Sequence, residues 1–244
     1  MTQAYRDDLR QFAAKPWPTM YDLPSEDPEE PGLPDEFHDL QPQLLSATLR
    51  LADVARDRIF TGTDINLYYD LNHPLWHKRP DWFVAIGVPR LYGREDLRLS
   101  YVTWDEGVNP YVVVELLSPG TEKEDLGQTE AGEGEPPTKW DVYESILKVP
   151  YYVLYDRYSN ILRGYRLVEG RYQAMVRENN RFWMPELKVG LGLWQGEYED
   201  RTRPWLRWFN GESDWISTPL EQAEAKATRL AQQLRALGID PEAG

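Results

Sequence analysis

The sequence contains no cysteine, so it has neither a disulfide framework nor thiolate chemistry. It also has no stretch that approaches the roughly 18 apolar residues of a membrane span. The first ten residues, MTQAYRDDLR, lack the apolar segment of a signal peptide. These absences exclude a disulfide-stapled scaffold and lead us to expect a cytoplasmic protein that does not cross a membrane.

Positive charge is scarce. The chain has 27 Lys and Arg against 41 Asp and Glu, which gives a formal net charge of -14. A nucleic-acid binder usually shows a basic footprint, because Lys and Arg neutralise the phosphates. The chain as a whole repels phosphate, so contact with DNA would need a local basic groove or a divalent metal ion that screens the site.

Apolar periodicity predicts a mixture of strands and helices in the 244 residues. Residues 16–42, rich in proline and acid, predict an arm over the surface, and a helix should follow Pro42. Two further elements are a short helix at 138–148 and an acidic Gly/Pro-rich loop at 127–138. Strands are expected at 63–71, 81–87, 99–104, 111–117, 150–156, 161–168 and 171–176. This order indicates an α/β (α+β) class with a mixed sheet.

Residues 219–238 predict a C-terminal helix that ends at Gly238. Its apolar stripe consists of Leu220, Ala223, Ala227, Leu230, Leu234 and Leu237. We expect this stripe to pack on its own domain, with a homodimer contact as the alternative.

Glu115 stands out within the apolar run VVVELL. Successive side chains of a strand point to opposite faces, so Glu115 shares a face with Val113 and Leu117. A carboxylate on an apolar face is costly unless it is paired or binds a metal. A partner for Glu115 is therefore expected.

Asp81, at the start of the strand-like WFVAI, is a candidate for that partner. Two strands of one sheet could bring Asp81 and Glu115 within about 4 to 7 Å, which suits one Mg²⁺ or Mn²⁺ ion completed by a backbone carbonyl and water. Repulsion and burial should then raise the pKa of at least one of the two carboxyls. The alternative is that each carboxylate only caps a turn or pairs with Lys78 or Arg79.

The pattern of Pro-Asp, about thirty residues, then Glu on an apolar strand resembles the PD-(D/E)XK nuclease superfamily with the restriction-endonuclease-like fold. Within it, the chain resembles the bacterial Uma-two family of endonucleases from about residue 35 to 241. The resembling stretches are RPDWFV, VVVELLSPGTEKEDLG, KWDVYESILKVPYYVLYD, WLRWF and the tail LRALGIDP. The resemblance implies one restriction-endonuclease-like domain at 35–244 behind an arm at 1–34, with a mixed central sheet flanked by helices. It also implies that Asp81 and Glu115 hold the metal ion.

The chain departs from the superfamily at Leu117, where a lysine normally stands. The Uma-type pattern carries its lysine on the following helix, with a tyrosine four residues later, and Lys139 and Tyr143 match that pair. Asp125 matches an aspartate between the strand and the helix. By resemblance, Lys139 is catalytic and Asp125 and Tyr143 support it. We expect the Lys139 ammonium to point at the Asp81–Glu115 pair. We also expect Lys139→Met to abolish cleavage while folding and metal binding stay nearly intact.

Other candidates have fewer signals behind them. Glu36 is a candidate outer acid, and His73 and His77 have the i, i+4 spacing of zinc ligands, although Pro74 argues against a helix there. Ser118 has no histidine in a recognisable partner motif, which favours a turn-forming serine over a nucleophile.

These features predict a Mg²⁺-dependent DNA endonuclease that hydrolyses phosphodiester bonds. A competing interpretation is a nuclease fold that has become a catalytically silent binding or regulatory module, which the net charge and Leu117 favour. A third is a carbohydrate-binding module, supported only by the 10 Trp residues.

Overall fold

The computed structural model describes residues 35–118, 122–132 and 134–240. The chain divides into two compact units, Met1–Asp39 and Leu40–Gly244. The expected arm at residues 1–34 lies outside the described residues, and the single domain at 35–244 stays a prediction. None of the described helices is long and apolar enough to cross a membrane.

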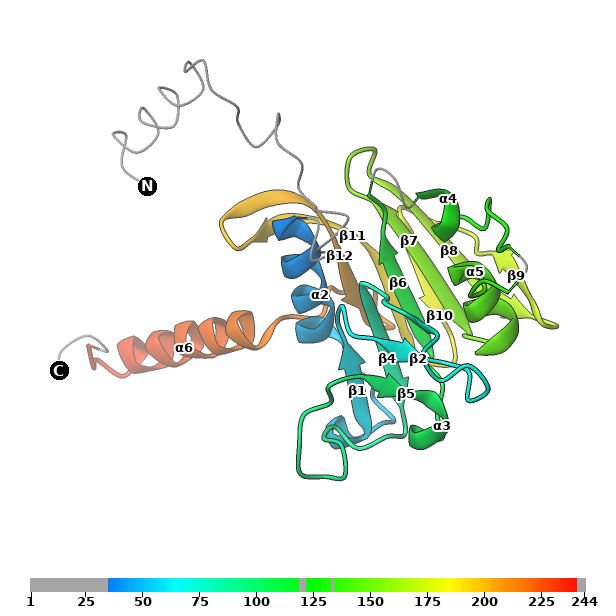
Figure 1. Ribbon diagram of the computed structural model, residues 1–244. Coiled ribbons are helices and arrows are strands. Elements are labelled where there is room, and N and C mark those ends of the chain that lie inside the picture. Colours follow the sequence, from blue (N-terminus) through cyan, green and yellow to red (C-terminus); the bar gives the residue numbers. More distant parts are fainter. Residues whose placement is uncertain (1–34, 119–121, 133, 241–244) are drawn as a thin grey trace, which may run out of the picture. The chain divides into compact units, whose positions relative to one another are not determined.

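A six-stranded mixed sheet forms the centre of the second unit (Figure 1). In spatial order its strands are β1 (Ile59–Gly62), β4 (Trp82–Ile86), β6 (Val112–Leu116), β7 (Tyr151–Asp156), β8 (Ile161–Val168) and β9 (Arg171–Ala174). Strands β6 and β7 are parallel, and the other neighbours in this sheet are antiparallel. The mixed sheet confirms the expected α+β class.

The described part of the connection between β6 and β7 carries three short helices. A parallel strand pair needs such a crossover, because a hairpin can join only antiparallel strands. The helices are α4 (Glu122–Asp125), α5 (Lys139–Asp141) and the π-helix η2 (Val142–Ile146). Thr138 starts α5 by accepting a hydrogen bond from the Asp141 backbone N–H at 3.2 Å. The helix expected at 138–148 is thus confirmed in position.

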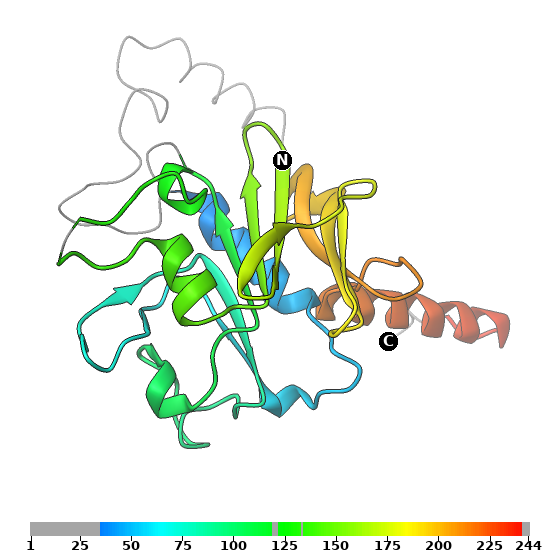
Figure 2. The ribbon, with the colours of Figure 1, turned by 90° about the vertical axis from the view of Figure 1, so that its right-hand side faces the viewer.

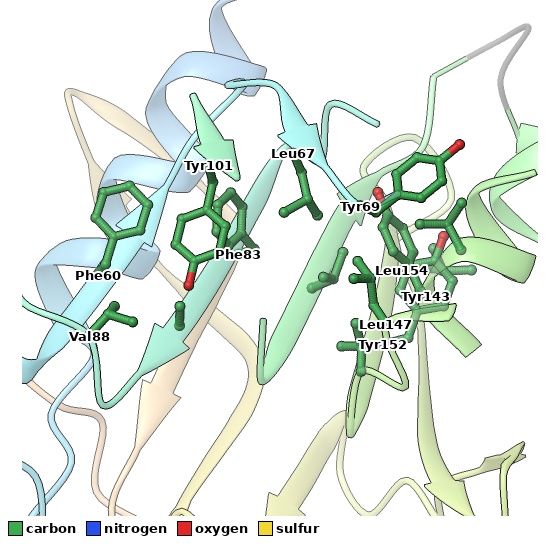
Figure 3. Close-up of a cluster of buried hydrophobic side chains, with 14 of the residues drawn as sticks. Phe60, Leu67, Tyr69, Phe83, Val88, Tyr101, Tyr143, Leu147, Tyr152 and Leu154 are labelled. Atoms are coloured by element: carbon green, nitrogen blue, oxygen red, sulfur yellow. The ribbon is translucent and has the colours of Figure 1, made fainter. Parts of the chain in front are cut away.

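Buried side chains of β4, β6 and β7 join this connection in a hydrophobic cluster (Figure 3). Phe83, Val113 and Tyr152 come from the sheet, and Tyr143 comes from η2. A small second sheet adds further members of the cluster. Its strands are β3 (His77–Lys78), β2 (Leu67–Tyr68) and β5 (Tyr101–Val102), followed by the helix α3 (Thr103–Glu106); the 3-10 turn η1 (Arg56–Arg58) precedes β1.

A third, antiparallel sheet consists of β10 (Arg181–Met184), β11 (Val189–Tyr198) and β12 (Arg201–Phe209). Figure 2 shows it across the central sheet from α5. Trp82 meets Trp208 with ring centroids 5.9 Å apart, and Phe182 lies so close to Gly164 that an added Cβ would be 2.8 Å from the ring. These three strands were not predicted from the sequence. Strand β12 contains Pro204, which an edge strand tolerates.

The helix α2 (Glu36–Thr48) begins six residues before Pro42 and contains it. The prediction that this helix follows Pro42 is therefore wrong at its start. An internal proline removes one helical hydrogen bond, but tertiary burial overrides such local preferences. Leu44 and Leu45 in the same helix are completely buried.

The helix α6 (Pro219–Ala236) agrees with the expected C-terminal helix. Thr218 and Glu221 form a reciprocal capping box at its start, and Glu221 also pairs with Arg207 of β12. No residue of α6 is buried, so the prediction that its stripe packs on its own domain is wrong.

Candidate active site

Glu115 is a fully buried carboxylate on β6, on the cluster face of the sheet. Its Oε1 accepts a hydrogen bond from the Tyr143 hydroxyl at 2.8 Å. Its Oε2 lies 3.1 Å from the Lys139 ammonium. These contacts are the partners that a carboxylate on an apolar strand face requires.

Asp81 lies across from Glu115 because of the strand register. It immediately precedes β4, where Trp82 pairs with Val114 in an antiparallel ladder. The Asp81 N–H donates to Glu115 Oε2 at 3.3 Å, and Asp81 Oδ2 accepts from the Leu116 N–H at 2.6 Å. Opposed residues in such a ladder have Cβ atoms about 4.5–5.5 Å apart. The separation of the carboxylate oxygens stays a prediction.

Lys139 links Glu115 to Asp125. Its Nζ lies 2.8 Å from Asp125 Oδ1, and its side chain is only 17% exposed. The ammonium therefore points at the carboxylates and not into solvent. Asp125 itself, the last residue of α4, has a side chain 2% exposed.

Leu117, in the position of the superfamily lysine, is a member of the apolar cluster and is 3% exposed. No cation can come from that position. Lys139, the first residue of α5, brings an ammonium group to the acids instead. Its backbone N–H donates a hydrogen bond to Glu124 Oε1 at 3.1 Å.

The four charged residues of the site are electrostatically unbalanced, because Asp81, Glu115 and Asp125 are acidic and only Lys139 among them is basic. Burial raises the pKa of Glu115 well above its usual value; Lys139 opposes that rise, and Asp125 and Asp81 add to it. Burial alone would lower the pKa of Lys139, but Glu115, Asp125 and Asp81 outweigh it and raise this pKa. The expected rise in the pKa of at least one carboxyl is confirmed for Glu115.

The chemical type of the donors fits a divalent cation. Asp81 and Glu115 present hard carboxylate oxygen atoms, which Mg²⁺ prefers as ligands. The excess of acidic groups would also be offset by a dication. Among the described residues no three His, Cys, Asp or Glu side chains converge on one metal position. A magnesium ion here would need water or substrate oxygens to complete its coordination.

Glu124 and Tyr152, which the sequence analysis did not place in the site, support its helices. Glu124 Oε1 accepts a hydrogen bond from Lys78 at 2.8 Å and another from the backbone N–H of Lys139 at the start of α5. Tyr152 of β7 donates to the Asp125 carbonyl at 3.0 Å. Arg79, considered as a partner of the site acids, pairs with Asp64 at 2.7 Å. No local sequence signal marks Tyr152 or Glu124, because their partners come from other elements.

The remaining candidates lie as follows. Glu36 is exposed in the first turn of α2, and its supporting role stays a prediction. His77 lies in strand β3, and His73 pairs with Asp70 and stacks on Trp76, so the two histidines do not share a helix. Ser118 directly follows Leu117 after β6.

Replacing Tyr143 with Phe should destabilise the fold by about 1–3 kcal/mol, because one oxygen of a buried carboxylate loses its donor. Thermal or urea unfolding measures this change. Tyr158→Phe is the control, since Tyr158 is 64% exposed. Equal stability of the Tyr143 variant and the parent would contradict the importance of this bond.

One family model matches the chain over most of its length. The Uma2 family model, described as "Putative restriction endonuclease", matches residues 7–199. Among solved structures, the chain is similar to "a putative nuclease belonging to DUF820" from Anabaena variabilis ATCC 29413. The two are 14% identical, the match covers 73% of this chain and 89% of that one, and the TM-score is 0.39. No curated protein matches. The family match includes every site residue described above and ends before α6.

Proposed function

Because this chain belongs to the Uma2 family of restriction-endonuclease-like proteins, we propose that it is a metal-dependent endonuclease that hydrolyses the phosphodiester bonds of DNA. One observation carries the proposal: Lys139 is held between the buried acids Glu115 and Asp125, beside Asp81. This excess of acidic groups, with one fixed ammonium, suits hydrolysis of an anionic substrate assisted by a dication. A cytoplasmic location accompanies the proposal as a prediction.

Each side chain has a separate task in this proposal. Asp81 and Glu115 would hold the ion, which when bound polarises the phosphodiester and lowers the pKa of a water molecule. The Lys139 ammonium stabilises the negative charge that develops on the phosphate, because it is already oriented by Glu115 and Asp125. Tyr143 fixes the rotamer of Glu115 through its hydroxyl.

The proposal is tested by incubating the purified chain with supercoiled plasmid and Mg²⁺ or Mn²⁺. Nicked and linear products are expected with either ion, and excess chelator should suppress them. Linear duplex, single-stranded DNA and RNA in parallel reactions distinguish the substrate. A preparation that folds but cleaves none of these nucleic acids with either ion would favour the silent binding module.

Millimolar Mg²⁺ or Mn²⁺ should stabilise the folded chain without any nucleic acid. A ligand at about 100 times its dissociation constant adds about 2.7 kcal/mol to the free energy of unfolding. For a chain of this size that corresponds to a melting temperature higher by roughly 5–10 °C. Scanning calorimetry with and without the ion measures the shift, and Ca²⁺ at the same concentration tests its specificity. A melting temperature that neither Mg²⁺ nor Mn²⁺ changes would argue against an ion site at Asp81 and Glu115.

A further inference from the structure

The helix α6 and its C-cap residue Leu237 expose most of an apolar stripe, in which only Leu234 is partly buried. Leu220 is 67% exposed, Leu230 46% and Leu237 75%, and the helix buries none of its residues. The helix does not depend on that stripe for its start, because the Thr218–Glu221 capping box and Pro219 define it. An exposed stripe on a well-capped helix indicates a surface that another helix covers.

The stripe has the spacing of a two-stranded coiled coil. Its positions advance by alternating steps of three and four residues: Leu220, Ala223, Ala227, Leu230, Leu234 and Leu237. This is a heptad pattern, in which every stripe residue occupies a core position against a second helix. A helix that packs on a globular core usually has a broader apolar face, with three or four apolar positions in each two turns.

We propose that α6 pairs with α6 of a second copy of this chain, antiparallel, to form a homodimer. In the centred antiparallel register, Leu220 meets Leu237, Ala223 meets Leu234 and Ala227 meets Leu230, each across the two copies. Each of these facing pairs then contains at least one leucine, so every small alanine packs against a large side chain. A parallel pair would instead stack Ala223 and Ala227 on their own copies and leave two neighbouring layers underfilled.

Charge favours the same orientation. The first half of α6 holds Glu221, Glu224 and Lys226 and is acidic on balance, whereas the second half holds Arg229 and Arg235 and is basic. Antiparallel pairing sets the acidic half of each helix along the basic half of its partner and opposes the two helix dipoles. It also brings the preceding parts of two chains with a net charge of -14 each to opposite ends of the pair, which lowers their repulsion.

The dimer should be reversible. An 18-residue helix is about 27 Å long and provides fewer than three heptads. A seam of this length is smaller than a standard stable interface, so the dimer should dissociate on dilution.

Sedimentation of the full chain over a range of concentrations tests the proposal. A monomer–dimer equilibrium is expected for the parent. Leu230→Glu should raise the dimer dissociation constant by at least about 100-fold, because each copy would place a carboxylate in the apolar seam. Gln232→Glu, on an exposed position outside the stripe, adds the same charge and should dimerise like the parent. Circular dichroism checks that both variants keep the helix.

A parent chain that stays monomeric, or a Leu230→Glu variant that dimerises like the parent, would overturn the proposal. So would a larger closed assembly. None of these readouts depends on nuclease activity, so the proposed dimer and the proposed function can fail separately.

Engineered cysteines test the orientation, since the chain has none of its own. The double variant Ala223→Cys/Leu234→Cys should form interchain disulfides on oxidation, because these positions face each other in the antiparallel register. Ala223→Cys alone should not, since 11 residues of axial offset are about 16 Å and a disulfide needs Cα atoms within about 7 Å. Efficient cross-linking of the single variant would indicate a parallel pair and overturn the antiparallel assignment.

Discussion

Replacing Asp81 with Asn is expected to lower the rate of DNA cleavage by at least ~1,000-fold, comparable with the loss of a fixed transition-state contact. Asparagine has nearly the same size, and its oxygen can still accept the hydrogen bond from the Leu116 N–H. The fold should therefore persist, while the site loses one of the two charges proposed to hold the ion. The same substitution should remove most of the stabilisation by Mg²⁺, because an amide oxygen is a poorer ligand for a hard dication.

Two measurements check this prediction: plasmid cleavage at saturating Mg²⁺, and calorimetry with and without the ion. Asp105→Asn is the matched control, since Asp105 is exposed and bonds only to the Tyr92 hydroxyl in the hydrogen bonds described for it. The control should cleave and respond to Mg²⁺ like the parent. If Asp81→Asn retained cleavage within a few-fold of the parent, the metal-holding role of Asp81 would be wrong.

Replacing Lys139 with Met should abolish cleavage and also destabilise the fold by about 3 kcal/mol. The earlier expectation that folding would stay nearly intact does not fit the structure, because the ammonium is shared by two buried acids. Breaking a buried ion pair from one side leaves an uncompensated charge and typically costs 3–5 kcal/mol. For a chain of this size, about 3 kcal/mol corresponds to a melting temperature lower by roughly 10 °C.

Calorimetry and plasmid cleavage separate the two consequences of this substitution. Cleavage should be measured well below the melting temperature of the variant, so that lost stability does not imitate lost catalysis. Added Mg²⁺ should raise the melting temperature of the variant more than that of the parent, since its site carries one positive charge less. Lys123→Met is the control, because Lys123 is an exposed lysine on α4, beside the residue that holds the start of α5. Cleavage by Lys139→Met at the parental rate would refute the catalytic assignment.

Some features of this protein follow from local sequence signals. The alternation around Glu115 predicted a carboxylate on an apolar face, and the structure places Glu115 there, completely buried. The apolar stripe from Leu220 to Leu237, with Gly238 behind it, predicted α6, because helix periodicity and capping act within a few residues. The resemblance to a nuclease family rested on short motifs, and the Uma2 match supports it.

Pairings between distant segments were decided by the tertiary structure. Lys139 reaches Glu115 from 24 positions away because the crossover helix packs on the strand face, and no periodicity in the sequence encodes that distance. Strand β12 exists despite Pro204 because it occupies a sheet edge, and α2 continues through Pro42 with two completely buried leucines. The first outcome depends on the place of the strand in its sheet, and the second depends on burial against other segments, which overrides local preference.

The exposure of the α6 stripe shows the same division. The sequence determined that residues 219–236 form a helix with one apolar face, because helix periodicity is a local property. Whether that face is covered depends on the surface available elsewhere in the chain. In the described part of the chain α6 leaves most of its stripe in solvent, although Leu234 is partly buried. Because covering a face requires a complementary surface in the tertiary structure, the sequence pattern alone could not decide whether the stripe packs on its own domain or forms a homodimer contact.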